Sequence, residues 1–74
     1  MRRIKVSSSI IKSVGYNSLE KRLEVEFVNG SVYEYNGIPG DVYSRLMTTS
    51  SVGSYFHNTV KGFGGVKISS EEGD

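Results

Sequence analysis

Two alternating segments that meet at Asn29-Gly30 constrain this chain more than any other feature of its sequence. Residues 22–28 and 31–35 both alternate apolar with polar side chains, as strands with one buried face do. Asn and Gly both accept the positive φ that tight hairpin turns require, so Asn-Gly between two such segments is a strong hairpin signal. The sequence therefore predicts an antiparallel β-hairpin over residues 22–35.

The register of this hairpin follows from the pattern of its side chains. A two-residue turn would place Val25 opposite Glu34 and put a carboxylate on the apolar face, which is costly. A three-residue loop over 28–30, with Gly30 in the left-handed conformation as a bulge residue, leaves only Val32 of the apolar strand residues on the polar face. We therefore expect the bulged turn. Its predicted pairs are Phe27 with Ser31, Val25 with Tyr33 and Leu23 with Tyr35.

The chain is short for a protein that must bury a core. It has 74 residues, no cysteine and one histidine, and a core of this size supplies only about 3–5 kcal/mol unless a staple helps. Disulfides and thiolate metal sites are excluded, and His57 alone cannot complete a metal site, so we expect no metal and no cofactor. Oligomerisation is the remaining common route to stability, which predicts a homo-oligomer, with a dimer favoured.

Formal charge is nearly balanced overall but is uneven along the chain. The net charge of +1 argues against the broad basic footprint of many nucleic-acid-binding proteins. The first residues are basic and the last are acidic, and we expect solvated, loosely ordered ends, the alternative being a basic arm that contacts phosphates. No signal peptide or membrane-spanning apolar run is recognisable, which predicts a cytoplasmic protein. The charged residues of the two ends are Arg2, Arg3, Lys5, Glu71, Glu72 and Asp74.

A further strand is expected before the hairpin, over roughly residues 10–16. Ile10, Ile11 and Val14 do not alternate cleanly there, and a bulge would reconcile them with one buried face. A polar turn connects this segment to the hairpin. Together they predict a three-stranded antiparallel meander.

Two short helices are expected after the hairpin. Pro39 suits the first turn of a helix because it has no amide hydrogen to leave unpaired, and Asp41 suits the positive end of the helix dipole. Ser50 or Ser51 can cap the second helix. The buried stripes are predicted to be Val42, Tyr43, Leu46 and Met47 in the first helix, and Val52, Tyr55, Phe56 and Val60 in the second.

These elements predict an α+β fold, a three-stranded antiparallel meander followed by two short helices packed on one face. No linker or internal repeat divides the chain, so residues 1–74 are expected to form a single domain with a core over about residues 6–68. Gly62, Gly64 and Gly65 are expected to end the packed region.

Glycine, proline and aromatic residues recur in this chain at spacings typical of one known family. The motifs are Ser8-Ser9 before an Ile, Val14-Gly15-Tyr16, Leu-x-Val-x-Phe-x-x-Gly-x-x-Tyr-x-Tyr from Leu23 to Tyr35, Ile38-Pro39, Val42-Tyr43 and Ser51-x-Gly53-x-Tyr55-Phe56. This combination resembles the KTSC domain family over residues 8–66. That family takes its name from a domain at the C-terminus of some lysyl-tRNA synthetases, and it also occurs as short stand-alone proteins of bacteria and phages. The resemblance implies a small domain that would carry any tRNA role by itself.

The start of the second helix is the best candidate for a ligand site. Serine hydroxyls gather there, and Gly53 would let a ligand approach the backbone amides, which attract anions at helix N-termini. A basic residue on each side could supply positive charge. The competing interpretation is that Ser51 only caps its helix and Gly53 only allows close packing against the sheet. The candidate binding residues are Arg45, Ser50, Ser51, Gly53, Ser54, Tyr55 and Lys61.

The chain is rich in aromatic residues, with five Tyr and three Phe. Aromatic rings on a small sheet can stack nucleic-acid bases. The predicted register, however, puts Tyr33 and Tyr35 on the covered face, where they pack in the core. Tyr16, Tyr55 and Phe63 are therefore the better candidates for contact with a ligand or a partner.

No catalytic arrangement stands out in the sequence. His57, Ser54 and Thr59 lie close together, but this spacing on a surface helix does not provide a nucleophile, a base and a group that orients the base. The sequence therefore predicts a non-catalytic binding module and no enzyme.

Two kinds of binding function remain open. The first is recognition of a phosphate-bearing ligand, RNA or a small nucleotide, and a phage-encoded member could use it to sequester a nucleotide signal. The second is a protein-interaction or oligomerisation module that acts as an adaptor or as an inhibitor of a host protein through a sheet edge or an aromatic patch. Salt separates the two, because nucleic-acid binding weakens steeply with salt and an apolar interface does not.

Overall fold

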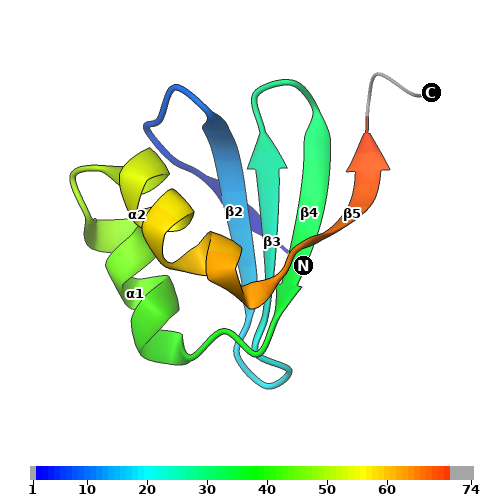
Figure 1. Ribbon diagram of the computed structural model, residues 1–74, viewed down its shortest axis with the longest axis vertical. Helices are drawn as coiled ribbons and strands as arrows, with labels where there is room; N and C mark the ends of the chain where they lie inside the picture. Colours follow the sequence, from blue (N-terminus) through cyan, green and yellow to red (C-terminus); the bar gives the residue numbers. More distant parts are fainter. Residues whose placement is uncertain (1, 71–74) are drawn as a thin grey trace.

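A computed structural model describes residues 2–70. It contains one antiparallel sheet, and the helices pack on one face of this sheet (Figure 1). Four strands come first along the chain, the helices follow, and a last strand returns to the sheet. The elements are β1 (Arg3–Lys5), β2 (Ile11–Asn17), β3 (Arg22–Phe27), β4 (Ser31–Asn36), α1 (Gly40–Thr48), α2 (Val52–Asn58), the 3-10 helix η1 (Val60–Phe63) and β5 (Val66–Ser70).

The sheet has five strands, so the predicted three-stranded meander is wrong. Its order is β1-β2-β3-β4-β5, and each neighbouring pair is antiparallel. β1 pairs with β2 at one edge of the sheet, and β5 lies beyond β4 at the other edge (Figure 1). Neither edge strand alternates between buried and exposed residues. β1 is exposed throughout, and Val66 and Ile68 of β5 are 59% and 46% exposed. The broader expectation of an α+β fold is confirmed.

The basic start of the chain is a strand and not the loosely ordered end that the sequence predicted. Arg3 pairs with Gly15, and Lys5 pairs with Ser13, in an antiparallel ladder with β2. The backbone of this segment is therefore held by the sheet. The acidic residues predicted for the other end, at positions 71–74, lie outside the described residues.

The hairpin of β3 and β4 has the predicted bulged turn. Gly30 has a φ of 94°, in the region that only glycine adopts without strain. Its amide donates a hydrogen bond of 2.9 Å to the carbonyl of Phe27, and the amide of Ser31 donates one of 2.9 Å to Oδ1 of Asn29. The expected pairs present in the ladder are Leu23 with Tyr35 and Val25 with Tyr33.

β2 contains the bulge that its irregular alternation indicated. The register of β2 against β3 shifts between Ile11 and Ser13. Ile11 and Val14 are both fully buried, although their spacing does not fit a regular strand. The bulge is thus what places both side chains in the core.

Both helices begin at the residues that the sequence indicated. Pro39 stands directly before α1, and Asp41 lies in its first turn. Ser51 stands directly before α2. Within residues 2–70, none of the helices has the length and apolar character that crossing a lipid bilayer requires.

The core lies between the sheet and the helices. Leu46 of α1, Phe56 of α2 and Val60 of η1 are buried against it. The predicted stripe residues that pack against this core while partly exposed are Val42, Tyr43, Met47 and Tyr55. The buried residues of the core are Ile11, Val14, Leu23, Val25, Tyr35, Ile38, Leu46, Val52, Phe56 and Val60.

The opposite face of the sheet carries glutamates that are matched by basic side chains. On this face, Ser13 Oγ donates a hydrogen bond of 2.7 Å to Glu26 Oε1, and each of the three glutamates forms an ion pair with a basic side chain. Partly exposed ion pairs contribute little to stability, but together they offset the acidic charge of this face. The pairs are Arg3–Glu24 at 3.1 Å, Lys12–Glu26 at 4.0 Å and Arg22–Glu34 at 3.3 Å.

The buried core ends at Val60, just before the glycines that were predicted to end the packed region, and residues 61–69 are all exposed. The chain nevertheless continues beyond these glycines as a paired strand. Gly64 ends η1 with a φ of 75°. Gly65 lies against the ring of Tyr35, and a Cβ atom at this position would overlap that ring. The chain therefore passes close over Tyr35 and returns to the sheet as β5.

Candidate functional site

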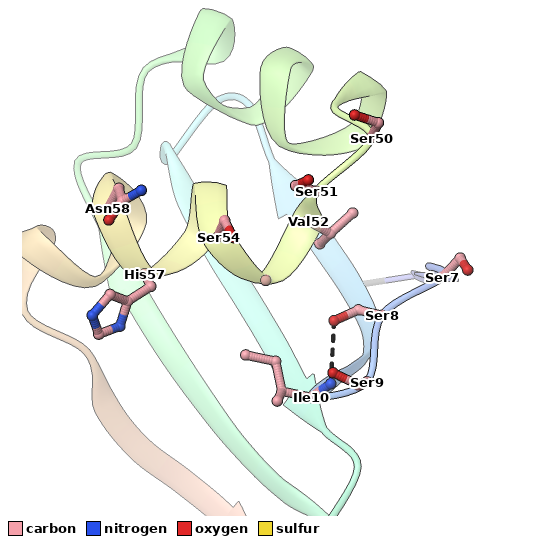
Figure 2. A pocket seen from close by; sticks show the side chains of 11 residues that line it. Ser7, Ser8, Ser9, Ile10, Ser50, Ser51, Val52, Ser54, His57 and Asn58 are labelled. Carbon is pink, nitrogen blue, oxygen red and sulfur yellow. Dashed lines mark hydrogen bonds between the residues drawn. The ribbon is translucent and has the colours of Figure 1, made fainter.

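A pocket of about 550 Å³ lies between the loop that precedes β2 and the start of α2. Figure 2 shows the two segments facing each other, with Ile10 between the loop and the helix. Serine side chains dominate the lining, and we call this site the hydroxyl pocket. Its serines are Ser7, Ser8, Ser9, Ser50, Ser51 and Ser54.

The loop side of the hydroxyl pocket is shaped by Ser8. Its Oγ accepts hydrogen bonds from the amides of Ile10 at 3.2 Å and Ile11 at 3.3 Å, which turns the chain into β2. The first of these bonds is drawn in Figure 2. The turn leaves the side chain of Ile10 against α2 at Gly53, where a Cβ atom would lie 3.4 Å from Ile10 Cδ1. The loop and the helix are thus in van der Waals contact at Gly53.

Four of the sequence-predicted site residues meet in the hydroxyl pocket, namely Ser50, Ser51, Gly53 and Ser54. Ser51 occupies the N-cap position of α2 but makes no capping hydrogen bond with its side chain. The amide of Ser51 instead donates to Oγ1 of Thr49 at 3.2 Å. The hydroxyl of Ser51 is therefore not used in capping, which was the competing interpretation of this residue.

The basic residues proposed as charge partners are not in the hydroxyl pocket. Arg45 and Tyr55 line a separate hollow of about 320 Å³ with Thr48 and Thr49. Lys61 lines a third site, beside the aromatic core. The structure therefore divides the predicted set among three neighbouring surfaces.

The third site is an aromatic pocket of about 400 Å³ at the other end of α2. Its rings pack edge to face, with centroids 5.6 Å apart for Phe27 and Tyr33, and 5.5 Å apart for Phe27 and Phe56. Burial raises the pKa of Tyr35, and Tyr33 beside it raises that pKa further. The hydroxyl of Tyr35 therefore remains a donor at neutral pH. The residues that line the aromatic pocket are Ile10, Phe27, Tyr33, Tyr35, Phe56, His57 and Lys61.

The hydroxyl pocket and the aromatic pocket adjoin each other. Ile10 and His57 line both of them. In Figure 2, Ile10 and His57 lie on the same side of α2, with the serines of the loop beyond Ile10. We call the two pockets together the α2 groove, with a hydroxyl half and an aromatic half.

Positive charge accompanies the aromatic half of the α2 groove. Lys61 lines it, and Lys67 pairs with Tyr33 in the sheet register and so stands on the same face. Among residues 2–70, no aspartate or glutamate lines either half. An anionic ligand in the groove therefore meets no acidic lining.

The three aromatic residues predicted for ligand contact all lie outside the α2 groove, and Tyr55 lines the separate hollow of about 320 Å³. Tyr16 stacks on Tyr43 with centroids 4.4 Å apart, and its hydroxyl donates a hydrogen bond of 2.6 Å to the carbonyl of Ile38. These contacts give Tyr16 a structural role. Phe63, at the end of η1, is 39% exposed.

Sequence reasoning missed the loop side of the groove. Ser7, Ser8 and Ser9 are three consecutive serines, but nothing local to them indicates that they face a helix more than forty positions later. Asn58 also lines the hydroxyl pocket and was not singled out as a binding residue. The three consecutive serines before an apolar strand were the available signal.

A protein-family model described as the KTSC domain matches residues 7–63. The matched segment contains all of the residues that line the α2 groove, and it leaves out the two edge strands β1 and β5. A crystal structure of a KTSC domain protein from Yersinia pestis superposes with a TM-score of 0.87 and 36% identity, covering 92% of this chain and 97% of that one.

Relatives of this chain include both stand-alone proteins and much larger ones. An uncharacterized protein of Stutzerimonas stutzeri is 36% identical over 61 residues, which are 82% of this chain and 86% of that protein. A lysine–tRNA ligase of Trichormus variabilis is 42% identical over 59 residues, which are 80% of this chain but only 10% of the ligase. The chain thus corresponds to about a tenth of that enzyme.

Proposed function

This chain belongs to the KTSC domain family, and on that premise we propose that it is a non-catalytic binding module whose α2 groove recognises a phosphate-bearing ligand, an RNA or a small nucleotide. The observation that carries the proposal is that a hydroxyl-lined pocket and an aromatic, lysine-flanked pocket adjoin along one helix. A ribonucleotide joins the same two kinds of chemistry in one molecule, a flat base and a polar sugar-phosphate.

The aromatic half supports the base-binding part of the proposal. Bases bind proteins by stacking or packing on aromatic side chains, which tolerate every base because each has a π face. Tyr33 and Phe27 are only half-buried, so part of their rings is open to a ligand. Lys61 and Lys67 on the same face can contact a phosphate.

The hydroxyl half supports a binding role better than a catalytic one. Within residues 2–70, His57 is the one ionisable side chain that lines it, and no carboxylate is present there to orient the imidazole. A nucleophilic serine needs both a base and a group that positions the base. We therefore assign no reaction to these serines.

The names of several relatives support the RNA part of the proposal. Several of them are lysine–tRNA ligases, in which the matching segment is a small part of the chain. These enzymes are named for tRNA, which is a phosphate-bearing molecule. For this chain an RNA ligand is part of the proposal.

Chemical-shift mapping tests the proposed site. The ¹⁵N-labelled protein would be titrated with single-stranded RNA of about six nucleotides, with ATP and with inorganic phosphate. We expect the amides of residues 7–10 and 52–58 to shift more than those of the hairpin tip at 28–30. A response to RNA but not to ATP would identify an RNA site, and the reverse would identify a nucleotide site. If all three probes leave these amides unmoved, the proposal is wrong.

Charge reversal at Lys61 gives a second readout. We expect Lys61→Glu to weaken RNA binding by roughly three- to tenfold, because it replaces a phosphate contact with repulsion. Lys21→Glu is the matched control, since Lys21 is exposed and lines neither half of the groove. Arg45→Glu should have a smaller effect than Lys61→Glu because Arg45 lines a separate hollow. Equal losses for all three variants would indicate non-specific attraction only.

A protein-interaction module is the second candidate function. The observation that favours it is the exposure of apolar side chains on the two edge strands, with Ile4 of β1 50% exposed and Val66 of β5 59% exposed. Exposed edge strands pair readily with other chains. This candidate becomes the favoured one if the groove binds none of the phosphate-bearing probes.

A further inference from the structure

We infer that the hydroxyl half of the α2 groove reads the 2′-hydroxyl of a ribose, so that the ligand is a ribonucleotide or an RNA and not its deoxy counterpart. This inference rests on the proposed function and assigns a chemical class to its ligand. It concerns the half of the groove that carries no lysine or arginine.

The hydroxyl half is polar but formally neutral. Its lining consists of serines with Ile10, Val52, Gly53, His57 and Asn58, and it contains no lysine, arginine or carboxylate. A phosphate prefers arginine or lysine, and neither lines this half, whereas Lys61 lines the other half. A neutral ligand group with hydroxyls suits the serine-lined half better, because each serine can both donate and accept a hydrogen bond.

The serine hydroxyls are available for such a ligand. Within residues 2–70, Ser8 is the one serine of the pocket whose hydroxyl takes part in a hydrogen bond of the protein, and it acts there as an acceptor for the amides of Ile10 and Ile11. Its O–H remains free to donate. Ser9, Ser51 and Ser54 are exposed and line the pocket, and their side chains make no hydrogen bond with other residues of the described chain.

The two halves of the groove adjoin, as the binding sites for a base and its sugar must. A ribose is bonded directly to its base, so the sites for the two must adjoin. Ile10 and His57 line both halves and mark the boundary between them. A base in the aromatic half therefore places its ribose beside Ile10, next to the serines of the loop and of α2 (Figure 2).

The test compares pairs of probes that differ only in the 2′-hydroxyl. Single-stranded oligoadenylate, oligocytidylate and oligouridylate of about six nucleotides would be compared with oligodeoxyadenylate, oligodeoxycytidylate and oligodeoxyuridylate by fluorescence anisotropy. We expect the ribo form to bind more tightly by about three- to tenfold, the range that one or two partly exposed hydrogen bonds provide. Equal or tighter binding of the deoxy form would overturn the inference and leave the proposed function standing.

Variants locate the discrimination. Ser9→Ala, Ser51→Ala and Ser54→Ala should each reduce the preference for the ribo form while leaving affinity for the deoxy form nearly unchanged. Ser44→Ala is the matched control, because Ser44 is exposed on α1 and lines neither half of the groove. If the three variants weaken both forms equally, the serines do not read the sugar and the inference is wrong. Absence of binding by every one of these probes, and by ATP and inorganic phosphate as well, would instead overturn the proposed function.

Discussion

Three glycines of this domain stand at a turn or against another segment for different reasons, although a Cβ atom at Gly53 would make only ordinary contact with its neighbours. Gly30 has a positive φ of 94° in the hairpin turn. Gly53 faces Ile10 across the hydroxyl pocket, and Gly65 lies against the ring of Tyr35. The first reason is conformational and local, whereas the other two depend on residues far away in the sequence.

Substitution at Gly30 tests the conformational reason. Gly30→Val should lower the free energy of unfolding by about 1–2 kcal/mol, since a β-branched residue fits positive φ poorly. Gly40→Val is the control, because a Cβ at Gly40 meets no atom within 4 Å and its φ is not positive. Urea denaturation measures both variants. A loss at Gly30 no larger than that at Gly40 would contradict the bulged turn.

The difference among these glycines also explains which site residues could be predicted. The hairpin turn could be predicted because Asn29 and Gly30 encode it by themselves. Ser51, Gly53 and Ser54 were readable because a helix start has its own local signal. The serines at 7–9 were not, because their place in the groove depends on the approach of Ile10 to Gly53, a contact between segments distant in sequence.

At the scale of elements, strands with a buried face were predicted and edge strands were not. β3 alternates between buried and half-buried residues because one of its faces is covered by helices. β1 and β5 bury little, so their side chains carry no comparable pattern, and they are held mainly by backbone pairing. Pairing of this kind is set by where the chain returns to the sheet, which local sequence does not reveal. The same limit applies to Arg45 and Lys61, whose surfaces depend on how α1 and η1 pack.

The return of the chain as β5 depends on the close approach at Gly65. Gly65→Ala should destabilise the domain by roughly 1–3 kcal/mol, because its Cβ would overlap the Tyr35 ring and overpack the site. Gly62→Ala is the matched control in η1, where a Cβ has open space around it. Thermal or urea unfolding of the two variants gives the comparison. If Gly65→Ala is tolerated as well as Gly62→Ala, β5 does not pass over Tyr35 as described.

At the scale of the whole molecule, the two faces of the sheet differ in charge. One face carries Glu24, Glu26 and Glu34 with their basic partners, and the other carries the helices and the α2 groove with Lys61 and Lys67. This separation explains how a chain with a net charge of only +1 can present a groove without acidic lining. Net charge alone, which argued against a broad nucleic-acid footprint, does not exclude a compact site.

The size of the domain and its two open edges lead to a last prediction, about assembly. A chain of 74 residues without cysteine has a small core, and Ile4, Val66 and Ile68 expose apolar surface on the edge strands. Pairing of an edge with a second copy would bury this surface and satisfy backbone groups. We therefore expect a homodimer whose melting temperature rises with protein concentration, because unfolding is then coupled to dissociation.

Sedimentation and calorimetry over a range of protein concentrations test this expectation. Val66→Lys and Ile68→Lys should shift the protein towards the monomer if β5 is the interface, since charges on an edge strand oppose pairing. Lys substitution at Ile4 distinguishes an interface formed by β1. Leu19→Lys is the control, because Leu19 is 95% exposed in a turn outside both edges. A single monomeric species at micromolar concentration, with a melting temperature independent of concentration, would show that the core alone is sufficient for stability.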